Sequence, residues 1–379
     1  MLIHAAARGA GHLAAQIARD LGAHVSGTFP LAEGAQAHAL AESGHTTGKL
    51  VITVRRPDAS AIGEGVGESA LIDLRSCRTM DRYEQFHRAA IDKGIPSDEV
   101  DMFAGQLRFA ICAGGCGQDE KVVGQSGGVP RLPVGVEWPG SGGGTPLPFI
   151  ASLDCAALPR VEGLPLPADG SLLFFLHHED DHMEDGHEFA RVLYVPAGTD
   201  TAVAALPCDP DSEIYSDGIP FLIPEYRLSA QVEAALPQWV EERDDGWPFD
   251  VESETVQRLF AELKHIDELC DVVDDLWPAD GASAFRIGGH YVDIGGDENP
   301  WYRMASANVR NRSGAEPGLP MSEKDRLIGA EEYRLSQEWV PLAQFCTESE
   351  FHYGCFLISA DDLAAERFDE MRSFTRFTE

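Results

Sequence analysis

Four histidines lie close together among several carboxylates in one short segment of this chain. They are His177, His178, His182 and His187. Imidazole nitrogens and carboxylate oxygens are ligands that zinc, nickel and copper accept, so the segment could bind a divalent metal without help from distant parts of the fold. The spacing matches neither a helical H-E-x-x-H motif nor a calcium-binding loop. The alternative interpretation is an acidic hairpin tip that is simply solvated.

A glycine turn near the start of the chain is a second segment with chemical potential. Gly9 and Gly11 stand between a predicted strand, 2–6, and a predicted helix, 12–21. A glycine turn at a helix N-terminus can bind the pyrophosphate of a dinucleotide through its backbone amides. The turn alone is a weak signal, because the site also needs a residue that reads the ribose and a crevice built by the whole sheet.

Residues 1–55 resemble pieces of the nucleotide-binding domain of quinone-oxidoreductase-type, zinc-alcohol-dehydrogenase-like enzymes. The strand, turn, helix and strand that end at Thr28 are similar to the first βαβ unit of that domain, and the strand 49–52 is similar to its last strand. The resemblance implies NADP(H) binding and an oxidoreductase activity. The rest of the Rossmann sheet is missing between Thr28 and Phe29. We therefore expect a truncated remnant with a vestigial Gly9–Gly11 turn.

The sequence does not predict a catalytic nucleophile. It contains no G-x-S-x-G turn and no G-x-x-x-x-G-K phosphate loop. Cys112 and Cys116 form a close pair, but no second cysteine pair stands nearby to complete a zinc site, so the eight cysteines are expected to be reduced thiols. We assign no catalytic residue and expect no cofactor, with NADP(H) and zinc as the alternatives. An enzyme would be an oxidoreductase of the zinc-alcohol-dehydrogenase-like class.

A segment rich in glycine and proline lies near the middle of the chain. It begins with Ser126-Gly127-Gly128-Val129-Pro130 and continues through Glu137-Trp138-Pro139 to residues 146–154. Proline fixes φ and favours extended backbone before it, and paired glycines allow conformations that other residues avoid. This pattern indicates a rigid irregular loop that leads into a strand. The second half has a similar turn at Gly288-Gly289 and a similar strand, 338–345, that includes Trp339.

This pattern resembles the YwqG-like family, known as domain of unknown function 1963. The resemblance covers about residues 80–379 and implies an α+β fold, in which duplicated mixed or antiparallel sheets with flanking helices follow a truncated Rossmann-like βαβ segment. It implies no reaction. The leading hypothesis is a non-enzymatic binding or interaction protein, with a cleft between the two halves. The cleft residues would be Gly127, Gly128, Trp138, Gly288, Gly289 and Trp339.

The elements that must position these residues fall into three stretches. Residues 1–55 are the dehydrogenase-like remnant, 56–78 a linker rich in glycine, serine and alanine, and 79–379 the YwqG-like domain. Periodicity within the domain predicts helices over 80–93 and 251–276, strands over 106–111, 170–176 and 191–195, a hairpin loop between the last two strands, and an exposed loop over 307–325.

Charge is the strongest feature of the composition. The chain has 63 acidic and 29 basic residues, for a net charge of −34. That charge disfavours nucleic acid and anionic membranes as partners and favours a basic protein; the alternative is a merely well-solvated surface. Without an apolar run of about 20 residues or a signal peptide, the protein is expected to be cytoplasmic. The sequence predicts no oligomeric state.

Overall fold

The computed structural model describes part of the chain in two compact units. The described residues are 25–30, 49–53, 81–177, 182–185, 189–208, 221–243, 252–278, 285–292, 299–313, 320–346 and 352–377. One unit is made of residues 1–81 with 280–282, and the other of residues 82–279 with 283–379. Among the described helices, none is both long and apolar enough to cross a membrane.

The first unit contains a parallel pair of strands. β1 (Val25–Pro30) pairs with β2 (Lys49–Thr53), and Phe29 lies opposite Ile52. Parallel strands need a long crossover connection, and residues 31–48 are long enough to provide one. The two predicted strands near Thr28 and at 49–52 are therefore present and parallel, whereas the predicted strand 2–6 lies outside the described residues. Gly9, Gly11 and the predicted helix 12–21 lie outside the described residues.

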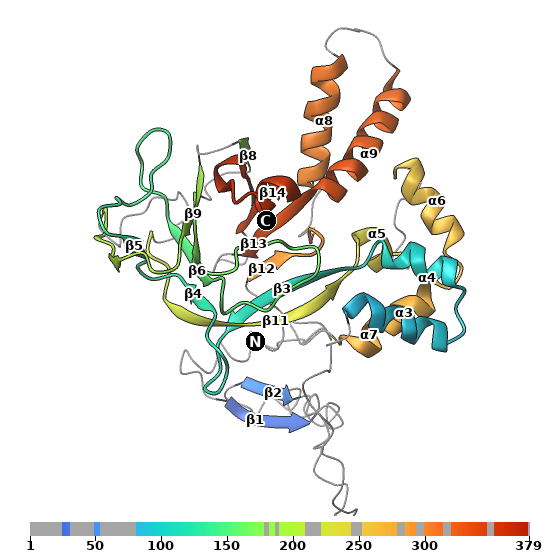
Figure 1. Ribbon diagram of the computed structural model, residues 1–379, viewed down its shortest axis with the longest axis horizontal. Helices are drawn as coiled ribbons and strands as arrows, with labels where there is room; N and C mark the ends of the chain where they lie inside the picture. Colours follow the sequence, from blue (N-terminus) through green and yellow to red (C-terminus); the bar gives the residue numbers. More distant parts are fainter. Residues whose placement is uncertain are drawn as a thin grey trace, which may run out of the picture. The chain divides into compact units, whose positions relative to one another are not determined.

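The second unit is an α+β fold built on one antiparallel sheet of eleven strands (Figure 1). The strands in chain order are β3 (Arg108–Gly115), β4 (Gly124–Ser126), β6 (Phe149–Asp154), β7 (Ser171–Leu176), β8 (His182–Asp185), β9 (Ala190–Val195), β11 (Tyr226–Ala235), β12 (Phe285–Gly288), β13 (Trp339–Cys346), β14 (His352–Ser359) and β15 (Arg372–Phe377). Their order across the sheet is β8-β15-β14-β13-β12-β3-β11-β4-β6-β7-β9. A separate ribbon pairs β5 (Arg131–Pro133) with β10 (Thr201–Val203).

The prediction of two sheets is wrong, because the long strands β3 and β11 join both sets of strands into one. β3 and β11 pair with each other over eight residues. β4 also pairs with β11 and begins the first strand set, β4, β6, β7 and β9. On the other side, β12 pairs with β3 and begins the second strand set, β12, β13, β14 and β15. The sheet is therefore continuous from one set to the other.

The sheet curls until its two edges approach each other. The segment between β7 and β9, which the sequence predicted as a hairpin loop, contains β8, and β8 pairs with β15 at the opposite edge. Only four residues, 186–189, connect β8 to β9 at the opposite edge, so the joined ends of the two edge strands are at most about 18 Å apart. Inside the curl, the ring of Phe174 on β7 lies 5.2 Å from Phe356 on β14 and 5.3 Å from Phe285 on β12.

Both strand sets carry a β-bulge at the same place. The extra residue of β6 is Ile150, which stands between the paired residues Phe149 and Ala151, and the extra residue of β13 is Leu342. A bulge lets two successive side chains face the same side of a sheet. Ile150 and Ala151 are accordingly both buried in the main core, as are Leu342 and its neighbour Ala343. The bulges thus raise the number of core side chains without lengthening the strands.

Helices extend this core beyond the ends of β3 and β11. They are α3 (Arg82–Asp92), α4 (Ser97–Ala104), α5 (Gln238–Glu241), α6 (Glu254–Glu262), α7 (Ile266–Leu276), α8 (Pro300–Ser313), α9 (Met321–Glu338), α10 (Ala360–Ala364) and the 3₁₀-helix η2 (Phe368–Glu370). α3, α4, α6 and α7 gather at one end of the long strands, while α8 and α9 form a projecting hairpin (Figure 1). The exposed loop predicted over 307–325 is therefore wrong for residues 307–313 and 321–325, because these belong to two helices that bury only a narrow apolar stripe. Residues 314–319 lie outside the described residues.

We predict that Phe174→Ala lowers the free energy of unfolding by about 3–5 kcal/mol, the usual cost of removing a buried phenylalanine ring. The ring is fully buried and joins strands from both sets. Chemical unfolding of the purified variant measures the change, with Val203→Ala as a surface control because Val203 is 62 % exposed. A loss below about 1 kcal/mol would show that the sheet does not depend on this contact.

Candidate functional site

Each strand set has one glycine pair at the end of its first strand: Gly127 and Gly128 follow β4, and Gly288 ends β12 and is followed by Gly289. All four glycines have positive φ, namely 62° at Gly127, 69° at Gly128, 71° at Gly288 and 74° at Gly289. Only glycine adopts this conformation without strain. Space is also closed, because a Cβ at Gly127 would lie 2.3 Å from the carbonyl oxygen of Pro224 and a Cβ at Gly128 would lie 2.6 Å from a carboxylate oxygen of Glu225. At both pairs the glycine backbone packs closely against neighbouring atoms of the protein.

The register of the sheet makes the two positions equivalent. Gln125 stands two residues before the first glycine pair and lies opposite Ser152, two residues after the bulge of β6. Arg286 stands two residues before the second glycine pair and lies opposite Gln344, again two residues after a bulge. The row of Gln125 and Ser152 in the first strand set therefore corresponds to the row of Arg286 and Gln344 in the second.

The structure does not bring the two glycine pairs together in one cleft. The N–H of Gly128 donates to the carbonyl of Ile223, which precedes β11. Gly288 lies opposite Ala110 of β3, which in turn lies opposite Glu233 of β11. Along β11, Glu233 lies seven residues after Tyr226, the partner of Ser126, so these positions are about 23 Å apart. The physical reason is that β4 and β12 run in opposite directions, so the turns that follow them lie at opposite ends of the sheet.

Each tryptophan of the predicted cleft packs into its own apolar cluster. Trp138 lies beside Phe175 and Phe221, with ring centroids 5.9 and 5.5 Å away, and its Nε1–H donates to the carbonyl of Leu147 at 2.8 Å. Trp339 packs against a second cluster near α8 and α9, and the guanidinium of Arg372 lies 5.0 Å from its ring centroid. Both indoles are half-buried and contribute to packing at separate places.

A hollow of about 400 Å³ lies beside the first glycine pair. The polar side chains that line it belong to Gln125, Ser152, Asp154, Ser171, Glu225 and Arg227. Ala151 and Leu153 face the main core, so Ser152 and Asp154 point to the other face of the sheet, because successive residues of a strand alternate. Farther along this face, the apolar cluster around Phe149 and Phe175 covers the sheet. The hollow lies over the part of this sheet face that the apolar cluster does not cover.

The groups around the hollow suit binding. Asp154, Glu225 and Arg227 are exposed and supply two carboxylates and one guanidinium. One carboxylate oxygen of Asp154 accepts from the backbone N–H of Ala156 at 3.0 Å, and the amide nitrogen of Gln125 donates to the carbonyl of Gly127 at 3.0 Å. The described residues that line the hollow include two serine hydroxyls but no histidine, lysine or cysteine. The arrangement offers charges and hydrogen bonds without an activated nucleophile.

The corresponding position in the second strand set is covered by the chain itself. The backbone N–H of Val292 donates to the side-chain oxygen of Gln344 at 3.1 Å, and the side-chain amide of Gln344 donates to the carbonyl of Val292 at 2.5 Å. Nearby, Nε2 of His290 lies 2.7 Å from the carbonyl oxygen of Gln106. Burial, with a further contribution from the charge of Arg108, lowers the pKa of His290 to about 3, so this imidazole is neutral.

The histidine segment lies mostly outside the described residues. His177 is described, and its backbone N–H donates to the carbonyl of Phe189 at 2.9 Å. The backbone of His182 begins β8 and lies opposite Thr375, but the side chain of His182 and all of His178 and His187 lie outside the described residues. Among the side chains that the structure does describe, no group of three histidine, cysteine, aspartate or glutamate residues could hold a metal ion. Metal binding by this segment stays a prediction.

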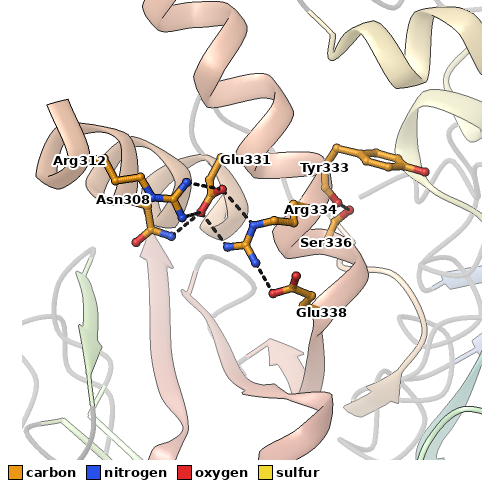
Figure 2. A network of polar contacts seen from close by, with 7 residues as sticks. All are labelled: Asn308, Arg312, Glu331, Tyr333, Arg334, Ser336 and Glu338. Atoms are coloured by element: carbon orange, nitrogen blue, oxygen red, sulfur yellow. Dashed lines mark hydrogen bonds and ion pairs between the residues drawn. The ribbon is translucent and has the colours of Figure 1, made fainter.

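The α8–α9 hairpin contains a polar network that sequence reasoning missed (Figure 2). Glu331 is only 5 % exposed, and its carboxylate accepts hydrogen bonds from Asn308 at 2.8 Å, from Arg312 at 3.2 Å and from Arg334 at 2.7 Å. Arg334 also pairs with Glu338. The bonds from Arg334 outweigh the effect of burial and lower the pKa of Glu331 to about 2. The network ties the two helices together, which is a structural role.

The next residue of α9 shows the opposite shift. Burial raises the pKa of Glu332 to about 7, although Asn299 donates a hydrogen bond to it at 2.9 Å, and the charge of Glu252 adds to the increase. Glu331 and Glu332 are adjacent in sequence but on different faces of the helix, and only Glu331 meets arginines. The sequence pattern of α8 and α9 does not indicate the pKa change of either glutamate.

Two family models match the chain. The model described as Domain of unknown function (DUF1963) matches residues 125–374, which are 250 of the 379 residues. This match begins in β4 and ends in β15, so it includes both strand sets. The model described as Zinc-binding dehydrogenase matches residues 9–52. Both resemblances that the sequence suggested are thereby confirmed. No curated protein matches the chain.

We predict that Gly127→Ala destabilises the protein more than Gly135→Ala does, by at least about 2 kcal/mol. Both glycines have positive φ, so alanine is strained at either position. Only at Gly127 would the new methyl group also meet backbone oxygens, whereas a Cβ at Gly135 would meet nothing within 4 Å. Unfolding in urea compares the two variants. Equal losses would mean that conformational strain alone explains the first glycine pair.

We further predict that Glu331→Gln lowers the free energy of unfolding at pH 7 by about 2–3 kcal/mol. A carboxyl whose folded pKa is lowered from 4.5 to about 2 stabilises the fold above its unfolded pKa, and this contribution disappears as the pH falls through that range. The matched control is Glu332→Gln. The raised pKa of Glu332 means that its ionisation costs stability as the pH rises from 4.5 toward 7, so this variant gains stability relative to the wild type between pH 5.5 and pH 8. Unfolding curves in which both variants have the same pH dependence would contradict these assignments.

Proposed function

We propose that this chain, which belongs to the family described as Domain of unknown function (DUF1963), acts without catalysis by binding a basic protein at the hollow beside Gly127. The observation that carries the proposal is the hollow itself. It is open, it has room for a ligand, and it presents Asp154 and Glu225 next to hydrogen-bonding groups on an ordered sheet.

The charge of the whole chain supports a basic partner. A net charge of −34 creates a long-range field that attracts cations and accelerates their encounter with the protein. Asp154 and Glu225 are exposed, so both carboxylates are accessible to a lysine or arginine side chain. Nucleic acid and anionic membranes stay disfavoured for the same electrostatic reason.

We also propose that the two strand sets are repeats of one unit. Each set runs in chain order across the sheet, has a glycine pair of positive φ after its first strand and has a bulge in its second strand. This supports the duplicated plan that the family resemblance implies, with both copies inside a single sheet. The binding site then belongs to one copy alone.

An NADP(H)-linked oxidoreductase activity of the N-terminal segment is the alternative function. The zinc-binding dehydrogenase match to residues 9–52 favours it. That match is short, however, and a dinucleotide site needs a complete sheet with its crevice at the ends of the strands. The binding proposal therefore ranks first.

We predict that the double variant Asp154→Asn with Glu225→Gln binds a basic probe about five- to tenfold more weakly than the wild type, because two ion pairs of modest energy are lost. The probe is a rhodamine-labelled eight-residue peptide of alternating lysine and alanine, measured by fluorescence anisotropy. Affinity should also fall as salt is raised, because salt screens exposed charges.

The matched control is Asp98→Asn with Glu84→Gln, which changes the net charge equally at exposed positions of α3 and α4. Its affinity should stay within twofold of the wild type. If both double variants lose affinity equally, the overall charge binds the probe and the hollow does not. Absence of binding to the wild type would contradict the proposed function.

A further inference from the structure

We infer that the hollow beside Gly127 binds its partner as an extended peptide segment, held through main-chain amide groups as well as through a basic side chain. The inference rests on the proposed function and specifies the form in which the partner is recognised. Of the two equivalent places on the sheet, one is open and the other is covered by the segment that contains Val292.

The second strand set shows what this place on the sheet accommodates. Val292 stands three residues after the second glycine pair, and it lies over Gln344. The side-chain amide of Gln344 accepts from the N–H of Val292 and donates to its carbonyl, which are the two bonds that a residue of a neighbouring strand would make. The fold therefore already uses this position to hold non-helical backbone.

In the first strand set, no corresponding segment of the described chain covers Ser152, the counterpart of Gln344. The residue that corresponds to Val292 by its distance from the glycine pair is Arg131, which lies in β5 and pairs with β10. The guanidinium of Arg131 donates to the carbonyl of Thr201 at 2.6 Å, and the N–H of Ala204 donates to the carbonyl of Pro130 at 3.0 Å. These bonds hold the segment away from Ser152, the counterpart of Gln344, and the hollow lies there instead.

The side chains of the hollow match the polar groups of a peptide backbone. Arg227, Gln125 and Ser152 lie opposite one another on three adjacent strands. Neighbouring strands are about 4.8 Å apart, so this row spans about 10 Å, or about three residues of extended chain. A guanidinium donates to carbonyl oxygens, and a hydroxyl both donates and accepts. Because the amide nitrogen of Gln125 bonds to Gly127, its oxygen is the atom that would accept a peptide N–H.

The carboxylates add a preference for a basic residue within that segment. Asp154 follows Ser152 on the same face of β6, and Glu225 precedes Arg227 on the approach to β11. A volume of about 400 Å³ lies at the lower end of the range for small-ligand sites, so it takes a few residues of chain and excludes a folded domain. An extended segment with one lysine or arginine fits the size, the charge and the hydrogen-bonding groups.

The test compares the lysine–alanine peptide described above with an isosteric peptide in which ester oxygens replace alternate backbone N–H groups. Charge and side chains are unchanged, whereas the replaced main-chain donors are lost and the adjoining carbonyls become weaker acceptors. We expect the wild-type protein to bind the ester peptide at least about fivefold more weakly, which corresponds to the loss of one or more net hydrogen bonds.

The variant Ser152→Ala completes a double-mutant cycle. It should weaken binding of the amide peptide by about three- to fivefold but change binding of the ester peptide by less than twofold, because the two changes remove a shared interaction. Ser152→Thr, which keeps the hydroxyl, should restore binding of the amide peptide. Circular dichroism and the unfolding midpoint show that each variant is folded.

Two results would be unfavourable, and they are distinct. If the two peptides bind equally well while Asp154→Asn with Glu225→Gln still weakens both, side-chain charge alone is recognised; the inference is then wrong and the proposed function stands. Free spermine that competes as well as the amide peptide would point to the same conclusion. If neither peptide binds to the wild type, the proposed function itself fails.

Discussion

The contact between Phe174 and Phe356 requires an eleven-stranded sheet to close almost completely on itself. These rings belong to strands that are seven positions apart in the sheet order, yet their centroids lie 5.2 Å apart. A sheet that curls this far has a small interior, which Phe285 and Phe345 fill together with the residues that the two bulges add. Hydrogen-bonding side chains of the long strands consequently lie on the outer face, where the candidate site is found.

The candidate site depends on a difference between two equivalent parts of that outer face. Both strand sets place a polar row next to a glycine pair, and the path of the following chain decides whether the row is covered. In the second set the backbone of Val292 is hydrogen-bonded to the side chain of Gln344. In the first set the corresponding residue, Arg131, belongs to the separate β5–β10 ribbon. A repeated architecture thus yields one covered position and one open position, without any change in the sheet that supports them.

Local features of this fold were predictable from the sequence, whereas its long-range pairing was not. Alternating and proline-bounded patterns located β3, β7, β9 and β13, and the glycine pairs do require positive φ. The pairing of β8 with β15 could not be predicted, because it depends on contacts between residues almost two hundred positions apart. The α8–α9 hairpin was missed because Glu331 and its arginines stabilise it with polar groups that resemble a loop in composition. The hollow could not be predicted from the sequence, because Ser152, Gln125 and Arg227 come together only through the register of three strands.

The pairing of β8 with β15 also has a consequence for the order in which the protein can be made. A ribosome releases β8 (His182–Asp185) before residues 186–371 have been added, which takes about 10–40 s at ordinary rates of translation. During that interval β8 lacks its hydrogen-bonding partner, and so does the outer edge of β14 when it emerges. The nascent chain can pair β4, β6, β7 and β9 early, but the curl of the sheet is completed only after residue 377 has been translated.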